Sequence, residues 1–273
     1  MNRTVVRGLF IFTLLVACNC SDYFTPWTVF QKPDLDPNRY PPDLSAAKPL
    51  NLGDSISQAY LGEGKVDWYA IQAKKDSTYV LTLYVQFDAE YMIIKSGDFS
   101  FISSGTVSYN GSHTVIWTCD TADTVYLKVS GAYLSDSGSY RLTLKTFQEV
   151  YGNSIDRYEP DSKDNRQEIY ATYPGYMETY TIRTLTHGDT DWFYISDYTS
   201  GTYTIRTVGN TDTKIGLLAV SGDSVIATDD NSGGGMNAKL SFYSSYYYHM
   251  FFVTGGTAAA SGAYGILVRY SYN

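Results

Sequence analysis

Clustered positive charge is the first thing that this chain of 273 residues lacks. It has 20 Lys and Arg against 28 Asp and Glu, which gives a net charge of −8, and its longest basic run is Lys74-Lys75. Because nucleic-acid phosphates attract clustered Lys or Arg, the sequence predicts no nucleic-acid partner.

Histidine and local catalytic motifs are also scarce. The three histidines are His113, His187 and His249, and there is no Gly-x-Ser-x-Gly, His-Glu-x-x-His or Cys-x-x-Cys motif. These motifs mark hydrolases and zinc sites, so the chain is predicted not to be an enzyme. A hydrolase with two paired carboxylates needs no local motif, and it stays open as a distant alternative.

Long hydrophobic runs are missing as well. The apolar stretch at residues 9–16 is about half of the roughly 20 residues that a membrane-spanning helix needs. Arg3 and Arg7 precede it, and a positive segment followed by a short apolar one is typical of an export signal. Residues 1–17 are therefore predicted to be a signal peptide.

That peptide ends in Leu15-Val16-Ala17-Cys18. The four residues resemble the lipobox of bacterial lipoproteins, in which the Cys is diacylated and becomes the new N-terminus. The resemblance implies lipidation of Cys18, a membrane partner held through that lipid, and a place in the bacterial cell envelope, at the outer membrane or the cell surface. The alternative is an ordinary signal peptide cleaved near Ala17.

Only three cysteines are present, which are too few for a disulfide framework. If Cys18 is lipidated, Cys20 and Cys119 could form a disulfide. Cys119 lies in an apolar, strand-like run, however, and we expect it to pack as a small hydrophobic residue. Stability must then come from hydrophobic cores.

Proline is almost confined to residues 18–49, which hold six of the eight. Such a segment is extended, at about 3.1 Å per residue, and predicts a tether. The prolines of this tether are Pro26, Pro33, Pro37, Pro41, Pro42 and Pro49.

Beyond the tether the chain repeats itself. Residues 67–79 recur at 191–203 without a gap, with an offset of 191 − 67 = 124. The same offset relates Tyr140 to Tyr264. The repeat predicts two domains, at 50–148 and 153–273, each of a size that can hold its own core.

Within both copies the apolar residues alternate with polar ones. This period of two predicts half-buried strands at 79–85, 125–129, 140–145 and 203–208. Turn-forming residues separate the strands every eight to twelve residues or so, as in a β-sandwich or jelly roll. The fold class is therefore predicted to be all-β, with two tandem jelly-roll-like β-sandwich domains.

The second copy resembles a known family over nearly all of residues 153–273. Its order of motifs is similar to that of the bacterial pre-peptidase C-terminal domain family, which includes collagen-binding modules of bacterial collagenases. The first copy keeps residues 66–69 and 138–140 but lacks the opening Glu-Pro-Asp. The motifs are Asp156-Arg-Tyr-Glu-Pro-Asp161, Gly188-Asp-Thr-Asp-Trp-Phe193, Gly201-Thr-Tyr-Thr-Ile205, Asp229-Asp-Asn231 and Ser261-Gly-Ala-Tyr264.

The resemblance implies a Ca²⁺ site in the second copy, with Glu159, Asp161, Asp189 and Asp191 as the candidate ligands. Arg157 departs from the family pattern because it stands where an acidic ligand is expected. The alternative is that these acidic residues only form turns and caps. The first copy has Lys65 in place of Asp189 (65 + 124 = 189), so no site is expected there.

Aromatic residues supply two further candidates. Tyr243, Tyr246, Tyr247 and Tyr248 are predicted to place some rings in solvent, where Tyr suits contact with a protein or carbohydrate ligand. The alternative is an ordinary solvent-facing strand. The repeated Asp-Trp pairs, at residues 67–68 and 191–192, are expected to bury both tryptophans while both aspartates cap the preceding turn; ligand platforms are the alternative.

Together these features predict a non-catalytic, lipid-anchored envelope or surface protein that acts as a binding or adhesion module. A structural spacer or assembly component of the envelope is the alternative, and a hydrolase accessory protein is the third.

Overall fold

The computed structural model describes residues 46–152, 158–160, 162–173, 180–196 and 200–272. The predicted signal peptide, Cys18, Cys20 and most of the tether lie outside these residues. So do Arg157 and Asp161 of the second copy.

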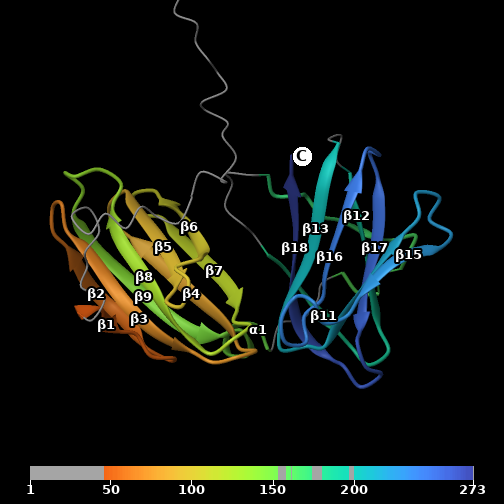
Figure 1. The fold of residues 1–273 in the computed structure, drawn as a ribbon, viewed down its shortest axis with the longest axis horizontal. Helices are drawn as coiled ribbons and strands as arrows, with labels where there is room; N and C mark the ends of the chain where they lie inside the picture. The colour runs from red at the N-terminus through yellow and green to blue at the C-terminus, as the bar shows by residue number, and fades with distance from the viewer. Residues whose placement is uncertain (1–45, 153–157, 161, 174–179, 197–199, 273) are drawn as a thin grey trace, which may run out of the picture. The chain divides into compact units, whose positions relative to one another are not determined.

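The first copy folds as two facing sheets (Figure 1), and its strands pair antiparallel except for β1 with β3. The five-stranded sheet consists, in spatial order, of β1 (Lys48–Pro49), β3 (Val66–Ala73), β8 (Asp123–Gly131), β5 (Ala89–Lys95) and β6 (Phe101–Val107). The four-stranded sheet consists of β2 (Ser55–Leu61), β9 (Gly138–Thr146), β4 (Thr78–Val85) and β7 (Ser112–Thr118).

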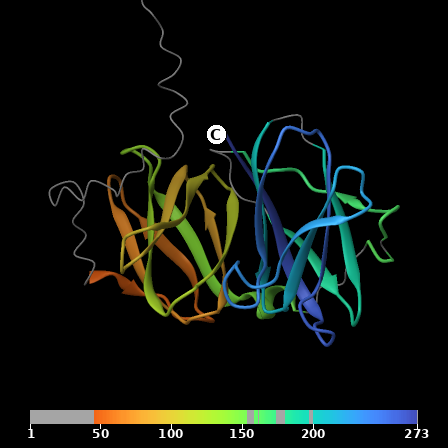
Figure 2. The same cartoon turned by 45° about the vertical axis from the view of Figure 1, so that its right-hand side comes forward.

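The second copy repeats this topology strand for strand, and Figure 2 shows its strands from a second direction. Its five-stranded sheet consists of β10 (Gln167–Glu168), β12 (Thr190–Ile195), β17 (His249–Gly255), β14 (Thr213–Leu218) and β15 (Val225–Asp229). Its four-stranded sheet consists of β11 (Thr181–Leu185), β18 (Gly262–Ser271), β13 (Gly201–Gly209) and β16 (Lys239–Ser244). The predicted all-β fold with two tandem β-sandwiches is confirmed.

A short helix, α1 (Phe147–Tyr151), follows β9. It starts with a capping box: the Thr146 hydroxyl accepts from the Glu149 backbone N–H, and the Glu149 carboxylate accepts from Thr146. Within the described part of the chain, no helix is long and apolar enough to cross a membrane.

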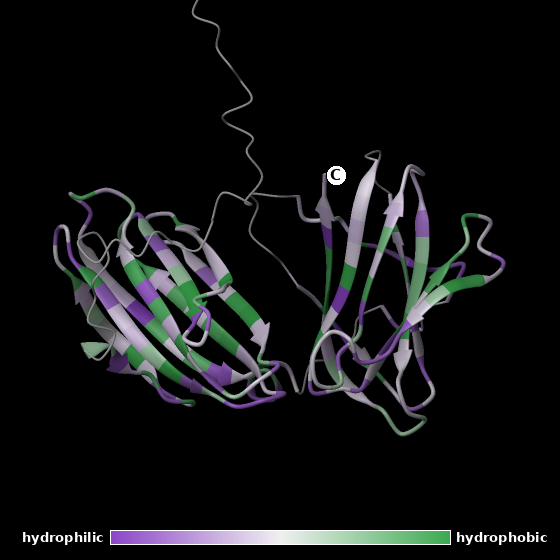
Figure 3. Ribbon diagram, viewed as in Figure 1, coloured by the Kyte–Doolittle hydropathy of each residue, from purple (hydrophilic) through white to green (hydrophobic). Residues whose placement is uncertain are grey.

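Each sandwich encloses its own hydrophobic core. Hydrophobic and hydrophilic residues alternate along the strands (Figure 3), because successive side chains of a strand point to opposite faces. In β9, for example, Leu142 and Leu144 are buried while Arg141 is exposed. Cys119 is a buried thiol in the first core, as expected.

The Asp-Trp pairs face the other way from our prediction. In β12 the buried positions are Asp191, Phe193 and Ile195, whereas Trp192 is only half-buried and packs on Phe252, with ring centroids 5.3 Å apart. Trp68 is likewise half-buried beside the buried Tyr69 of β3. The aspartate of each pair therefore lies on the core side of its strand, and the tryptophan lies on the outer side.

Candidate functional site

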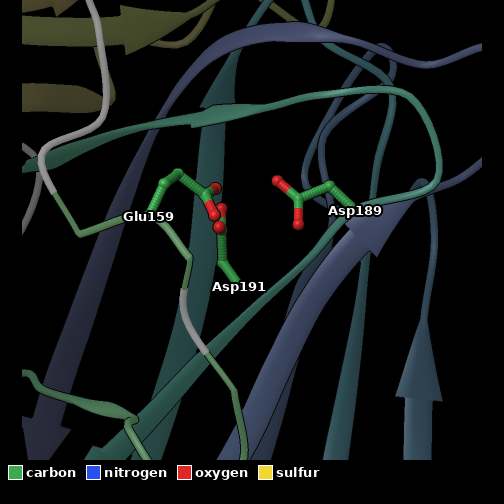
Figure 4. Close-up of side chains that lie close together, drawn as sticks. All are labelled: Glu159, Asp189 and Asp191. Carbon is green, nitrogen blue, oxygen red and sulfur yellow. The ribbon is translucent and has the colours of Figure 1, made fainter.

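Three of the four predicted calcium ligands come together at the start of β12. Asp189 precedes the strand, Asp191 is its second residue, and Glu159 belongs to the segment that leads toward β10. One carboxylate oxygen from each lies within 4.8 Å of the others, and Figure 4 shows the three side chains converging. The fourth predicted ligand, Asp161, lies outside the described residues.

Asp191 is the most deeply placed of the three. Only 1% of its surface is exposed, and its Oδ2 accepts a hydrogen bond of 2.5 Å from the Tyr264 hydroxyl. Tyr264 is fully buried in β18 of the facing sheet. The bond therefore crosses the sandwich and fixes the orientation of the Asp191 carboxylate.

Asp189 performs the turn-capping role that we expected of Asp191. Its Oδ2 accepts from the Thr186 backbone N–H at 3.3 Å, and its Oδ1 accepts from the Thr190 backbone N–H at 2.8 Å. Both bonds order the turn before β12 and point the carboxylate toward the cluster. The cap and ligand interpretations are compatible, because each carboxylate oxygen has a second lone pair.

The donor set fits a hard divalent cation. Calcium takes six to eight oxygen ligands from carboxylates, carbonyls and water, and this cluster offers carboxylate oxygens of graded exposure, from the exposed Glu159 to the buried Asp191. Carboxylates this close repel one another when ionised, and a cation relieves that repulsion. The structure thus brings Glu159, Asp189 and Asp191 together in an acidic cluster of the kind that can hold a metal ion.

The four predicted tyrosines separate into two groups. Tyr243 lies in β16, and Tyr246 and Tyr247 lie in the connection to β17. Their exposed fractions are 61%, 59% and 64%. These three residues, the tyrosine patch below, put large aromatic side chains into solvent.

Tyr248 does not belong to that patch. It is half-buried, and its ring stacks on Tyr194 with centroids 5.3 Å apart. Arg166 donates to its hydroxyl and lies 5.5 Å from its ring centroid. Through these contacts Tyr248, just before β17, packs against Tyr194 of β12 and against Arg166, which directly precedes β10.

Sequence reasoning missed the tyrosine partners of the two aspartates. Tyr264 donates to Asp191, and Tyr140 donates to Asp67 in the same way in the first sandwich. In both sandwiches the tyrosine follows its aspartate by 73 residues. The Asp-Tyr pair therefore recurs at the offset of 124, and this recurrence could have revealed it in the sequence.

Comparisons with known proteins add likenesses of fold. No family model matches the chain, and no curated protein matches its sequence. The structure is similar to the pre-peptidase C-terminal domain of a Bacillus anthracis collagenase, at 16% identity and a TM-score of 0.31, over 36% of this chain and 94% of that one. It is also similar to the periplasmic lysozyme inhibitor PliG of Aeromonas hydrophila, at 13% identity and a TM-score of 0.28, over 37% and 99%.

A third similarity covers both sandwiches. The tandem CBM22-1-CBM22-2 domains of a Paenibacillus barcinonensis protein match 84% of this chain and 99% of theirs, at 8% identity and a TM-score of 0.24. Likenesses this distant assign no function to this chain.

Proposed function

We propose that this chain is a non-catalytic binding protein of the bacterial cell envelope. A lipid on Cys18 holds it to a membrane, the proline-rich tether extends from that anchor, and the tyrosine patch of the second sandwich contacts a protein or carbohydrate ligand. The observation that carries the proposal is the exposure of Tyr243, Tyr246 and Tyr247, each at about 60% within five residues of chain.

Exposing aromatic surface to water costs free energy. Tyr offers a large, rigid contact area with a polar tip, and it loses little conformational entropy when it binds. Tyr243 also has its hydroxyl 3.0 Å from the Ser200 hydroxyl, which limits the positions of its ring. An ordered ring loses less freedom on binding than a mobile one.

We further propose that the second sandwich holds Ca²⁺ through Glu159, Asp189 and Asp191, with Asp161 as a fourth ligand. The ion would join the segment before β10 to the start of β12. Its role would be structural, because it would neutralise three clustered carboxylates and hold two chain segments together.

The ligand surface is tested with the mature full chain on glycan and extracellular-matrix protein arrays. A variant with Tyr243→Ala, Tyr246→Ala and Tyr247→Ala is compared with one that truncates the exposed Tyr60 and Tyr133 of the first sandwich. We expect only the first variant to lose binding, by at least tenfold, since a central aromatic contact contributes about 2 kcal/mol or more. Equal binding by both variants, or a wild-type chain that is silent on every array, refutes the ligand surface.

The calcium proposal is tested by titrating the chelator-treated full chain with Ca²⁺ in a calorimeter and by Tb³⁺ luminescence. Glu159→Gln is the informative variant, because Glu159 is exposed and its replacement spares the core. Glu63→Gln, on an exposed turn of the first sandwich, is the control. Binding that survives both Glu159→Gln and Asp189→Asn shows that the ion is held elsewhere.

The anchor is tested by fractionating cells that express the wild-type chain or Cys18→Ser. We expect the wild type in the membrane fraction and the variant in the soluble envelope fraction, because the variant has no thiol to acylate. Wild-type protein without acyl groups in mass spectrometry rejects the lipid anchor.

A further inference from the structure

An open groove lies on the outer face of the four-stranded sheet of the first sandwich. Its volume is about 410 Å³, within the roughly 300–1,000 Å³ of typical small-molecule sites. In β4, Leu83 and Val85 are buried on either side of Tyr84, so the Tyr84 side chain points away from the core and toward the groove. The lining residues include Ser57, Tyr84, Gln86, Ser139 and Arg141.

A β-bulge lies at one side of this groove. In the pairing of β2 with β9 the register shifts between Ile56 and Ala59. Two residues of β2, at positions 57 and 58, therefore stand opposite the single residue Arg141. Bulges bend a strand and redirect its side chains, and they are common beside functional sites.

Arg141 is the charged residue of the groove. It is exposed and is paired across the strands with Tyr84. Its guanidinium carbon lies 5.5 Å from the centroid of the Tyr84 ring. This attraction between a cation and an aromatic face restricts the guanidinium before any ligand arrives. Among the residues that the structure describes, no carboxylate forms an ion pair with Arg141.

The strands around the groove carry no negative charge. The whole chain has a net charge of −8, yet none of β2, β4, β7 and β9 contains an Asp or a Glu. Their Lys and Arg residues are Arg141 and Lys145, both in β9. An anion that reaches this face therefore meets positive charge, and no carboxylate of these strands repels it.

The second sandwich does not repeat the groove. The offset of 124 places Val208 at the position of Tyr84 (84 + 124 = 208) and Gly265 at that of Arg141 (141 + 124 = 265). These two residues are also paired across their strands, and both are buried. The shared fold therefore does not require a ring and a guanidinium at this place.

We propose that the groove binds a carbohydrate that carries carboxylates, such as an oligomer of a uronic acid. The planar guanidinium of Arg141 can donate two parallel hydrogen bonds to one carboxylate. The hydroxyls of Ser57 and Ser139 and the amide of Gln86 can both donate and accept, which suits the hydroxyl groups of a sugar. An acidic peptide would use the guanidinium but fewer of these neutral groups, so the lining favours the carbohydrate.

Calorimetric titration of the mature full chain with oligomers of galacturonate, of alginate and of hyaluronan tests this site. The titrations are done in chelator, so that Ca²⁺ cannot bridge the acidic sugars to the carboxylates of the second sandwich. The matched probe is the methyl ester of each oligomer, which keeps the sugar skeleton and removes the charge. We expect the wild type to bind at least one acidic oligomer about tenfold or more tightly than its ester, as charged hydrogen bonds allow.

Arg141→Gln is the informative variant, because Arg141 is exposed and its replacement spares the core. It should weaken binding of the acidic oligomer about tenfold or more and bring it to the affinity of the ester. Arg141→Lys keeps the charge without the paired donors and should retain only part of the binding. Lys145→Gln removes the same charge from the same strand outside the groove, so as the control it should bind like the wild type.

Each contrary result has a definite meaning. A wild-type chain that binds none of the three acidic oligomers refutes the site. Equal weakening by Arg141→Gln and Lys145→Gln also refutes it, since the general charge of the sheet then accounts for the binding. A tetraglutamate peptide that binds as tightly as the uronate oligomers shows a general carboxylate site and rejects the carbohydrate assignment.

The groove and the tyrosine patch are on different sandwiches, so their tests separate. The variant with Tyr243→Ala, Tyr246→Ala and Tyr247→Ala should bind the acidic oligomers as the wild type does. If that variant loses them while Arg141→Gln keeps them, the acidic sugars bind the second sandwich; the groove is then wrongly assigned and the proposed function stands.

Discussion

Replacing Tyr140 by Phe tests the buried network of the first sandwich most directly. The substitution removes one oxygen atom and leaves the ring, so the packing against Phe87, with ring centroids 6.4 Å apart, is kept. Tyr140 is fully buried. Its hydroxyl donates to Asp67 and lies 2.6 Å from the hydroxyl of Tyr69.

The expected loss follows from these two contacts. A hydrogen bond to a charged group contributes about 1.5–3 kcal/mol, and a buried hydroxyl left without its partner costs about 1–3 kcal/mol. Asp67 keeps Lys48, and 17% of its side chain remains exposed, so the losses do not add in full. We expect Tyr140→Phe to lower the free energy of unfolding of the first sandwich by about 2–4 kcal/mol, a large share of the roughly 5–15 kcal/mol of a typical domain.

Exchange of the β3 and β9 amides under native conditions measures this loss, at about tenfold per 1.4 kcal/mol. Tyr60→Phe is the matched control, because the Tyr60 side chain is 68% exposed and its hydroxyl loses little. The double variant Tyr69→Phe/Tyr140→Phe should cost less than the sum of the single variants, since it leaves no orphaned hydroxyl in the core. A Tyr140→Phe variant that exchanges within about threefold of Tyr60→Phe contradicts the reasoning.

Three further predictions concern the core, alkaline pH and acid pH. Phe251→Ala should destabilise the second sandwich by about 3–5 kcal/mol in urea unfolding, because the ring is fully buried and leaves a cavity; unchanged β12 exchange would contradict this. Burial raises the pKa values of Tyr69 and Tyr140 above 10.0, so their contribution to stability is complete below about pH 10 and is lost as the pH rises further. Alkaline unfolding followed by circular dichroism should therefore be less steep in Tyr140→Phe. The backbone N–H of Thr146 lowers the pKa of Glu149 below 4.5, so its capping box stabilises α1 above that pH and is lost as the pH falls; Glu149→Gln should remove this acid dependence of α1 exchange.

The strands could be predicted because their signal is local. Alternation of apolar and polar residues depends only on successive side chains pointing to opposite faces. The predicted strands at 79–85 and 140–145 accordingly lie within a residue or two of β4 and β9. The repeat at an offset of 124 residues can also be read directly from the sequence. It predicts two copies of one domain, and the structure has two sandwiches with the same topology.

The facing of Asp67-Trp68 could not be predicted from that alternation. One residue of the pair had to point inward, and hydrophobicity favoured the tryptophan. The structure buries the aspartate side, since a tyrosine hydroxyl from the opposite sheet lies there to donate a hydrogen bond. The packing of Tyr248 also depends on a distant contact that the alternation does not show. Arg166, 82 residues away in the sequence, donates to the Tyr248 hydroxyl.

The sequence by itself determined that this protein is a duplicated chain of alternating strands behind a short apolar N-terminus, because periodicity and repeats need no knowledge of distant contacts. Only the tertiary structure decided what contacts each of the two core-side aspartates, Asp67 and Asp191. Lys48 reaches Asp67 from 19 residues away through the pairing of β1 with β3, and Glu159 approaches Asp191 at the start of β12. The charge around a carboxylate depends on which segments fold against it, so the two equivalent aspartates have different neighbours.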